Sequence, residues 1–441
     1  MHINVAPPAK SKSGLSIGSL IGPLEQIFCV YSLLYATGGM DVITGSVAFV
    51  SLMRYSVLGM SILLLGFRWR ATLTALRRTR LLWILIIWIS LSFLWSTEPT
   101  ITFDAIKGQV IPAYAFSLYF ATRFNIRQQI RLVAVTLAIV ALFSLYYAVA
   151  VPSIGRHVGD KFDGAWKGIY MEKNKFSAMM TLTLLAFFVL NSFNKIKLER
   201  NLARLGLAFS ISMILLSTSV TGLLIFILLL VLLIAFQAYR WQGRRSILIG
   251  DVVVAAVVIT GSIVLQNWLP IMETLDKDPT MSGRTIIWYG TWMQIFERPW
   301  LGYGLEAVWL NGSSYASEVG RLIHRSFIPA HAHNGFLDMI LDIGWIGFTF
   351  FFVGFLSTFR AATNRAYIAK TPEDYWPLAI CLLMLFYNIT ESVLLRGSNF
   401  FWVVYMCVFI SIRTWPRQTE ILEASEPLSQ APNRARRLSA K

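Results

Sequence analysis

Charged side chains are scarce in this chain of 441 residues. Asp, Glu, Lys and Arg make up 14% of the sequence, whereas hydrophobic residues make up 56% and the mean hydropathy is +0.60. Because soluble globular domains carry about 25% charged residues, this composition excludes a water-soluble chain. It indicates instead that lipid is the solvent.

Cysteine is also rare. Cys29, Cys381 and Cys407 all fall in apolar runs and none is part of a CxxC pair, which argues against a disulfide framework and a thiolate metal site. The sequence also lacks a basic helix with interleaved aromatic residues. We therefore interpret the formal charge of +16 as contact with anionic lipid and topological bias, and expect no nucleic-acid partner.

What the sequence has in abundance is apolar runs long enough to cross a bilayer. They predict an all-α, polytopic integral membrane protein with about 12 transmembrane helices. The runs lie near residues 20–37, 43–66, 81–96, 106–122, 130–151, 175–192, 203–219, 221–239, 247–266, 342–360, 375–390 and 399–414.

The distribution of Lys and Arg predicts the orientation. With the N-terminus in the cytoplasm, the inner segments hold about 26 of the 39 Lys and Arg residues, as the positive-inside rule requires. The predicted divisions are a cytoplasmic segment 1–16, helices one to nine within 17–266, an extracytoplasmic loop 267–341, helices ten to twelve within 342–414, and a disordered cytoplasmic tail 415–441. A loop of roughly 70 residues is far longer than a connection between helices needs, so we expect the function to reside there.

The first motif in this loop is SGRTIIWYGTWMQIFERP. Its apolar residues recur at helical spacing after Ser282-Gly283, so Arg284 falls in the first turn of a predicted helix. A cation there opposes the helix dipole, which becomes favourable if an anion such as phosphate binds at the helix start. The alternative is that Arg284 reaches lipid headgroups or pairs with Glu306. Glu306 itself lies among aromatic residues, a combination that sugar-binding sites use.

Histidines form the second motif. Three of the five, His324, His331 and His333, fall within ten residues, and His333-Asn334 precedes a predicted helix that ends at Gly344. A histidine there is well placed to act as a general base toward a hydroxyl group. Zinc binding by His331, His333 and Asp338 is the alternative, but the spacing matches no known zinc motif.

These motifs resemble those of a known family. His333-Asn334 followed after nine residues by Gly344-x-x-Gly347, and the upstream SGRxxIW...ERPxLGYG block, look like the signature of the O-antigen ligase and polymerase superfamily. HAHNGFLD and NITESVLLRGSNFFW resemble its exopolysaccharide-polymerase branch. The resemblance implies a metal-independent, inverting transfer of glycans from an undecaprenyl diphosphate carrier to a sugar hydroxyl, at the periplasmic face of the bacterial inner membrane. It implies no cofactor.

The resemblance also extends to a second outer loop. Gly168 with Lys173 and Asn174 resembles a Gly-x-x-x-x-Lys-Asn block, which implies a phosphate-binding role for Lys173, with Asn174 beside it. Arg156 is the candidate for an arginine that the ligases carry nearby. Lipid headgroups are the alternative partners of the cations in this loop, which are Arg156, Lys161, Lys167, Lys173 and Lys175.

Other polar residues complete the prediction. Glu391, at the outer end of the eleventh run, is expected either to orient His333 or to bind sugar hydroxyls. Asp104 and Lys107 fit an i, i+3 pair, either as links within the bundle or, with Arg54, as a polar seam for the lipid diphosphate. The predicted site is His333 and Arg284 as catalytic residues, and a substrate-binding set of Lys173, Asn174, Arg156, Glu306, His331, Asn334 and Glu391.

Partners and competing functions follow from the same pattern. We expect an undecaprenyl-diphosphate-linked glycan as substrate, membrane lipid around the bundle and a chain-length regulator as a further partner. Ligation of a glycan to lipid A core is the alternative reaction. A lipid-linked oligosaccharide transporter is the competing class, but inverted repeats and broken midplane helices are not evident. A binding or assembly scaffold would not explain an anion receptor beside a base.

Overall fold

A computed structural model describes residues 17–159, 162–193, 196–238, 270, 283–324, 327–369, 371–395 and 400–415. In these ranges the chain is helical, apart from turns and one isolated β-bridge between Arg156 and Trp166. The all-α prediction is therefore confirmed for this part of the chain. The ninth predicted run at 247–266, Lys161, the segment 1–16 and nearly all of the tail lie outside the described residues.

The helices follow the predicted runs closely. The α-helices are α1 (Ile17–Ala36), α2 (Met40–Thr44), α3 (Val47–Phe67), α4 (Trp69–Arg78), α5 (Arg80–Leu91), α6 (Pro99–Ala105), α7 (Ile111–Arg123), α8 (Ile126–Ala150), α9 (Pro152–Gly155), α10 (Lys173–Phe193), α11 (Lys197–Leu216), α12 (Val220–Ala238), α15 (Arg284–Glu297), α16 (Ser314–Arg321), α17 (Gly335–Tyr367), α18 (Trp376–Thr390) and α19 (Phe400–Thr414). Short 3₁₀-helices span Ser92–Leu94 and Pro372–Tyr375, and a π-helix spans Ile106–Val110.

Four of the described helices, α3, α8, α10 and α17, are long and apolar enough to cross a membrane. Shorter apolar helices occupy Arg80–Leu94, Val220–Val231 and Phe400–Thr414. The helices thus coincide with the predicted runs over the described part of the chain, which supports a polytopic membrane protein. The number of spans stays a prediction.

One predicted connection is itself a helix. The basic segment RWRATLTALRRTR, expected as an inner turn, forms α4, whose apolar side chains gather on one face. Trp69 and Leu73 are exposed while Ala75 is buried. Such a short amphipathic helix suits the boundary between headgroups and acyl chains.

Two smaller predictions are settled in the same part of the chain. Asp104 and Lys107 form the expected ion pair, with 2.6 Å between Oδ1 and Nζ. The three cysteines lie inside helices, buried and unbonded to one another.

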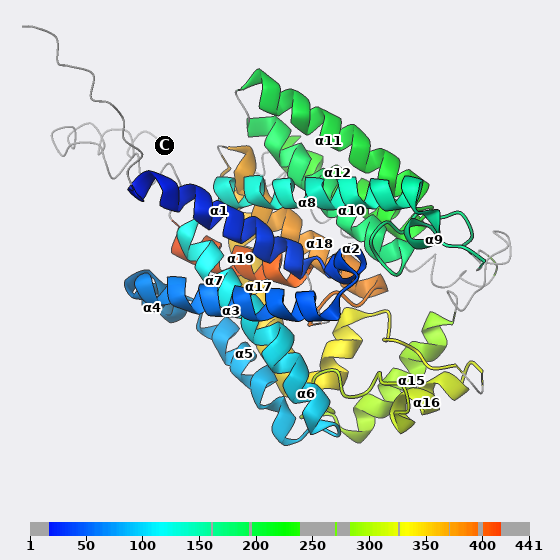
Figure 1. The fold of residues 1–441 in the computed structure, drawn as a ribbon. Coiled ribbons are helices and arrows are strands. Elements are labelled where there is room, and N and C mark those ends of the chain that lie inside the picture. Colours follow the sequence, from blue (N-terminus) through cyan, green and yellow to red (C-terminus); the bar gives the residue numbers. More distant parts are fainter. Residues whose placement is uncertain are drawn as a thin grey trace, which may run out of the picture.

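The centre of the bundle is formed by α18 and α19, whose side chains are buried along almost their whole length. α7 packs against α19, and α17 packs against α18. In Figure 1, the start of α1 and α4 lie at one end of the bundle, and α2, α9, α15 and α16 lie toward the other. The loop helices α15 and α16 therefore gather at the end that the charge pattern predicts to be extracytoplasmic.

The loop is fixed to α17 at a break in that helix. Gly344 has φ 67° and ψ 178°, so α17 is interrupted where the sequence predicted a helix end. Three backbone hydrogen bonds join residues 299–304 to residues 341–345, and we call this contact the glycine seam. They run from Trp345 N to Pro299 O (2.8 Å), Tyr303 N to Leu341 O (2.9 Å) and Gly304 N to Asp342 O (2.9 Å).

The seam explains two of the motif glycines. A Cβ atom on Gly344 would lie 2.0 Å from the Trp300 carbonyl oxygen, and one on Gly302 would lie 2.6 Å from the Leu341 carbonyl oxygen. Both residues also have positive φ, which glycine adopts at little cost. Side chains at these positions would separate the loop from α17, the helix that His333 precedes.

Candidate active site

The site is built around the start of α17. The Asn334 side chain accepts hydrogen bonds from the backbone N–H groups of Phe336 (3.1 Å) and Leu337 (3.2 Å), and so caps the helix. His333 immediately before it has φ 51°, a left-handed conformation that is uncommon outside glycine. Cap and backbone together fix the direction in which the imidazole leaves the chain. The predicted helix start is confirmed.

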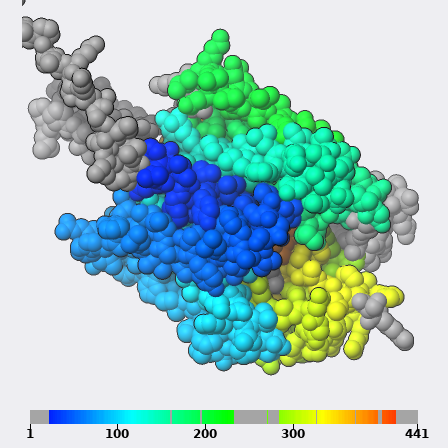
Figure 2. Space-filling view, in the orientation of Figure 1, coloured from blue at the N-terminus to red at the C-terminus, as the bar shows by residue number. Residues whose placement is uncertain are grey.

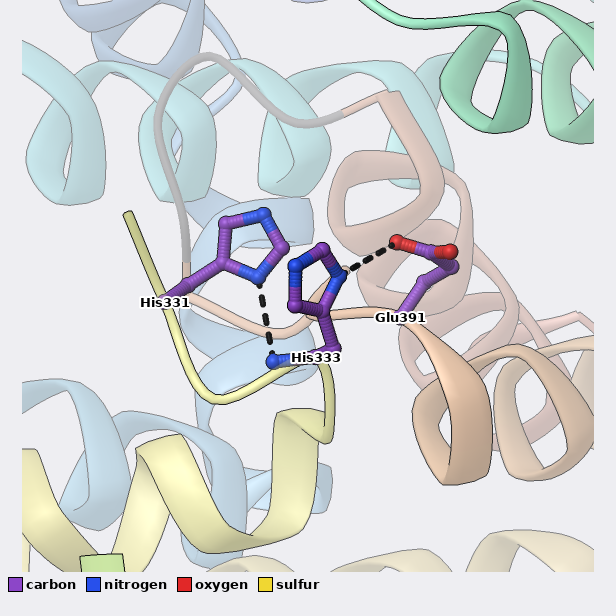
Figure 3. Close-up of side chains that lie close together, drawn as sticks. All are labelled: His331, His333 and Glu391. Atoms are coloured by element: carbon purple, nitrogen blue, oxygen red, sulfur yellow. Dashed lines mark hydrogen bonds and ion pairs between the residues drawn. The ribbon is translucent and has the colours of Figure 1, made fainter. Parts of the chain in front are cut away.

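The imidazole points to a carboxylate from another helix. His333 Nδ1 lies 3.4 Å from Oε2 of Glu391, the residue that follows α18 (Figure 3). Asn388 holds the chain after Glu391, because its Oδ1 accepts from the N–H groups of Val393 (3.2 Å) and Leu394 (3.1 Å). With the Nδ1 proton directed at Glu391, Nε2 is left as the basic nitrogen.

Arg284 binds the other side of the same carboxylate. It opens α15 after Gly283 (φ 85°), as predicted. Its Nη2 donates to Glu391 Oε1 at 2.8 Å, and its Nη1 donates to the Thr390 carbonyl oxygen at 2.6 Å. The partner of Arg284 is therefore Glu391 and not Glu306, which instead accepts from Gln109 Nε2 at 3.4 Å.

A third element completes the binding of Glu391. Asn174, in the first turn of α10, donates from Nδ2 to Glu391 Oε1 at 2.9 Å. Its own Oδ1 accepts from Ser219 Oγ at 3.0 Å, in the turn between α11 and α12. The sequence analysis missed Ser219, because a lone serine in an apolar region carries no motif.

These contacts set the charge state of Glu391. Burial alone raises the pKa of a carboxyl group, but the hydrogen bond from His333 and the positive charge of Arg284 outweigh it, so the pKa of Glu391 is below its usual value. The carboxylate is thus ionised throughout the neutral range.

We expect Glu391→Gln to lower the thermal stability of the detergent-solubilised protein, because it leaves the half-buried Arg284 charge without its partner. A group with a lowered folded-state pKa contributes stability that is fully present above its ordinary pKa and is lost as the pH falls through the lowered value. The difference in Tm between wild type and variant should therefore be constant at neutral pH and close below about pH 4. This difference is measured by heating the two proteins at a series of pH values and following the folded fraction by size-exclusion chromatography. A Tm difference that persists in acid would contradict the ion-pair assignment.

His331 packs directly on His333. The two ring centroids are 4.1 Å apart, and His331 Nδ1 accepts from the backbone N–H of His333 at 3.1 Å (Figure 3). An accepting Nδ1 places the proton of neutral His331 on Nε2. His331 thus supports the backbone that presents His333.

Asp338 is not placed as a zinc ligand. Its carboxylate accepts from the indole Nε1 of Trp309 (2.7 Å), from the backbone N–H of Ala332 (3.2 Å) and from the Ser392 hydroxyl. Asp338 therefore links the segment that contains His331 and His333 to the segment that follows α18. The donors that do converge are those of His331, His333 and Glu391, all within 4.8 Å of one another. A cation there would compete with Arg284 for Glu391.

The remaining predicted residues lie around this cluster and not in it. Lys173 directs Nζ to the Thr218 carbonyl and hydroxyl oxygens at 3.4 and 3.3 Å and sits over the Phe162 ring. Arg156 donates to the Ala148 carbonyl at 2.7 Å and lies over Trp166. In the described part of the chain, the structure brings together His333, Arg284, Asn174, His331 and Glu391, with Asn334 as the cap.

Comparison with known proteins bears on this arrangement. Residues 205–352 match the family model described as O-antigen ligase. The resemblance to the O-antigen ligase and polymerase superfamily is confirmed. The matched segment contains Arg284, His331, His333 and the glycine seam, whereas Asn174 and Glu391 lie outside it and complete the cluster from neighbouring helices.

A curated relative extends the similarity. The chain is 26% identical over 283 residues to "Exopolysaccharide production protein ExoQ" of Rhizobium meliloti (strain 1021), which covers 60% of this chain and 61% of that protein. The chain is thus similar both to the O-antigen ligase family and to an exopolysaccharide production protein, and the second match spans less than two thirds of either chain.

Proposed function

We propose that the protein is a glycosyltransferase that lengthens exopolysaccharide by joining undecaprenyl-diphosphate-linked oligosaccharide repeat units. The observation that carries the proposal is the line from His333 through Glu391 to Arg284. A buried carboxylate orients one imidazole nitrogen, and a guanidinium fixes that carboxylate. This is the arrangement of a general base held by an acid partner.

The reaction uses these groups in one displacement. The acceptor sugar hydroxyl attacks the anomeric carbon of the donor, its proton passes to Nε2 of His333, and the bond from that carbon to the diphosphate oxygen breaks. Attack from the face opposite the diphosphate inverts the anomeric centre. The imidazolium formed is stabilised by Glu391, which is already ionised at neutral pH.

Negative charge on the departing diphosphate needs cationic groups. Arg284 donates one N–H to the Thr390 carbonyl oxygen and one to Glu391. We propose that its other N–H groups bind phosphate oxygens. Lys173, the residue before Asn174, is the second cation of the proposal; its Nζ contacts Thr218 in this structure, so phosphate binding requires its side chain to turn toward the cluster. Arg284 and His333 lie at the end of the bundle that is predicted to be extracytoplasmic. This location favours catalysis at the periplasmic face of the inner membrane.

Ligation is the second candidate, because the matched family model is described as O-antigen ligase. The two reactions leave different products when the protein is missing. A deletion strain that accumulates single lipid-linked repeat units supports polymerisation. Long polymer that stays on its lipid carrier would assign ligation instead.

We expect catalysis without a metal ion, because Arg284 and Lys173 supply the positive charge that Mg²⁺ supplies in many transferases. Purified protein should extend lipid-linked repeat units at an unchanged rate in excess EDTA, as measured by gel separation of the products. His331, His333 and Glu391 are the residues to examine if chelation stops turnover and Zn²⁺ or Mg²⁺ restores it. That result would remove Arg284 as the main charge stabiliser.

A further inference from the structure

A cavity of about 280 Å³ adjoins the active site. Asn174, His331 and Glu391 form the wall that it shares with the catalytic cluster, and Asp41, Glu172 and Lys175 are on its other walls. In Figure 2 the surface is hollowed where the blue, blue-green and yellow parts of the chain meet, with orange chain between them. The volume lies just below the range of about 300 to 1,000 Å³ that is typical of small-molecule sites.

The walls come from separate parts of the chain. Asp41 belongs to the short helix α2, Glu172 precedes α10 and Lys175 lies in its first turn. Asp41, Glu172 and Lys175 line the same cavity. Apolar surface is supplied by residues that include Met171, which is 75% exposed, and the buried Phe401. The cavity is therefore lined by charged groups next to apolar side chains.

This combination favours a sugar over a phosphate group. Two carboxylates face one ammonium, and the third carboxylate, Glu391, is already neutralised by Arg284 at 2.8 Å. The net charge of the wall is thus unfavourable for a diphosphate, since like charges repel at short range. Carboxylates accept hydrogen bonds from hydroxyl groups, and apolar side chains pack against the C–H faces of a sugar ring.

We propose that this cavity binds the terminal sugar of the acceptor glycan, with Asp41 and Glu172 accepting hydrogen bonds from its hydroxyl groups. The proposal rests on the glycosyltransferase function proposed above. It places acceptor and donor on different sides of the catalytic cluster. The acceptor hydroxyl approaches past His331, and the diphosphate lies toward Arg284.

Separate measurement of the two substrates tests this arrangement. Purified wild-type protein, Asp41→Asn and Glu172→Gln are given lipid-linked repeat units as donor and a soluble oligosaccharide with the repeat unit's non-reducing end as acceptor. Transfer is measured against acceptor concentration. Hydrolysis of the donor by water, which forms free glycan and the carrier diphosphate, is measured without acceptor. Glu98→Gln is the matched control, because Glu98 is exposed and does not line the cavity.

Each cavity variant should raise the KM for the acceptor about tenfold, the effect of losing one hydrogen bond to a charged acceptor. Donor hydrolysis should stay within about twofold of wild type. An unchanged acceptor KM in both variants would overturn the proposal, and a parallel loss of hydrolysis would assign the cavity to the donor. Failure of the function itself is distinguishable, because wild type would then neither transfer nor hydrolyse the donor. Because Asp41→Asn and Glu172→Gln lie on different parts of the chain, the test remains possible if one of the two variants fails to fold.

Discussion

Replacing His333 with alanine should lower glycan transfer about a thousandfold or more. The variant removes the nitrogen that takes the acceptor proton and leaves Glu391 paired with Arg284 at 2.8 Å, so the surrounding structure keeps its charge balance. Transfer is measured with purified protein and lipid-linked repeat units. Expression, membrane insertion and thermal stability should remain close to wild type.

Two matched variants separate chemistry from backbone effects. His333 has a positive φ, which asparagine tolerates better than alanine, so His333→Asn tests the loss of the base with less backbone strain and should be equally inactive. His331→Ala should be milder, since His331 supports the His333 backbone without holding the proton. Near wild-type transfer in His333→Asn would remove His333 from the mechanism.

Replacing Arg284 with lysine should lower transfer about a hundredfold, although the charge is kept. The guanidinium joins the Thr390 carbonyl and Glu391 through two different nitrogens, and an ammonium group has no such planar fork. The orientation of Glu391, and through it of His333, should therefore be lost together with phosphate binding. The rate under saturating donor and acceptor measures the effect.

Arg298→Lys is the matched control for this variant. Arg298 follows the other end of α15 and lies over the Tyr303 ring, away from Glu391. Its replacement should leave transfer nearly unchanged. An Arg284→Lys protein with full activity would show that only a charge at this position matters, as contact with lipid headgroups would require.

Local structure around the site was predictable because its signals are local. The start of α15 at Arg284, the cap at Asn334 and the break at Gly344 follow from neighbouring residues and backbone geometry. The pairing of Arg284 was not predictable. Glu306 is nearer in sequence, but the fold brings Glu391 to Arg284 over 107 residues. Only the fold that places the start of α15 beside the end of α18 decides that choice.

The same reason explains what was missed around Asn174. Its contacts with Glu391 and Ser219 span 217 and 45 residues, so no periodicity contains them. A pattern of cations drew attention to the loop before α10. It did not distinguish Lys173, which turns to Thr218, from Lys175, which lines the cavity.

The glycine seam has a mechanical consequence. Because residues 299–304 are bonded backbone to backbone with residues 341–345, the loop and the two halves of α17 meet at one rigid joint. The loop cannot shift by itself without breaking these hydrogen bonds, since the two backbones are in close contact at Gly344 and Gly302. A displacement of the loop would therefore also displace α17 at its break, and with it the packing of α17 against α5 and α18.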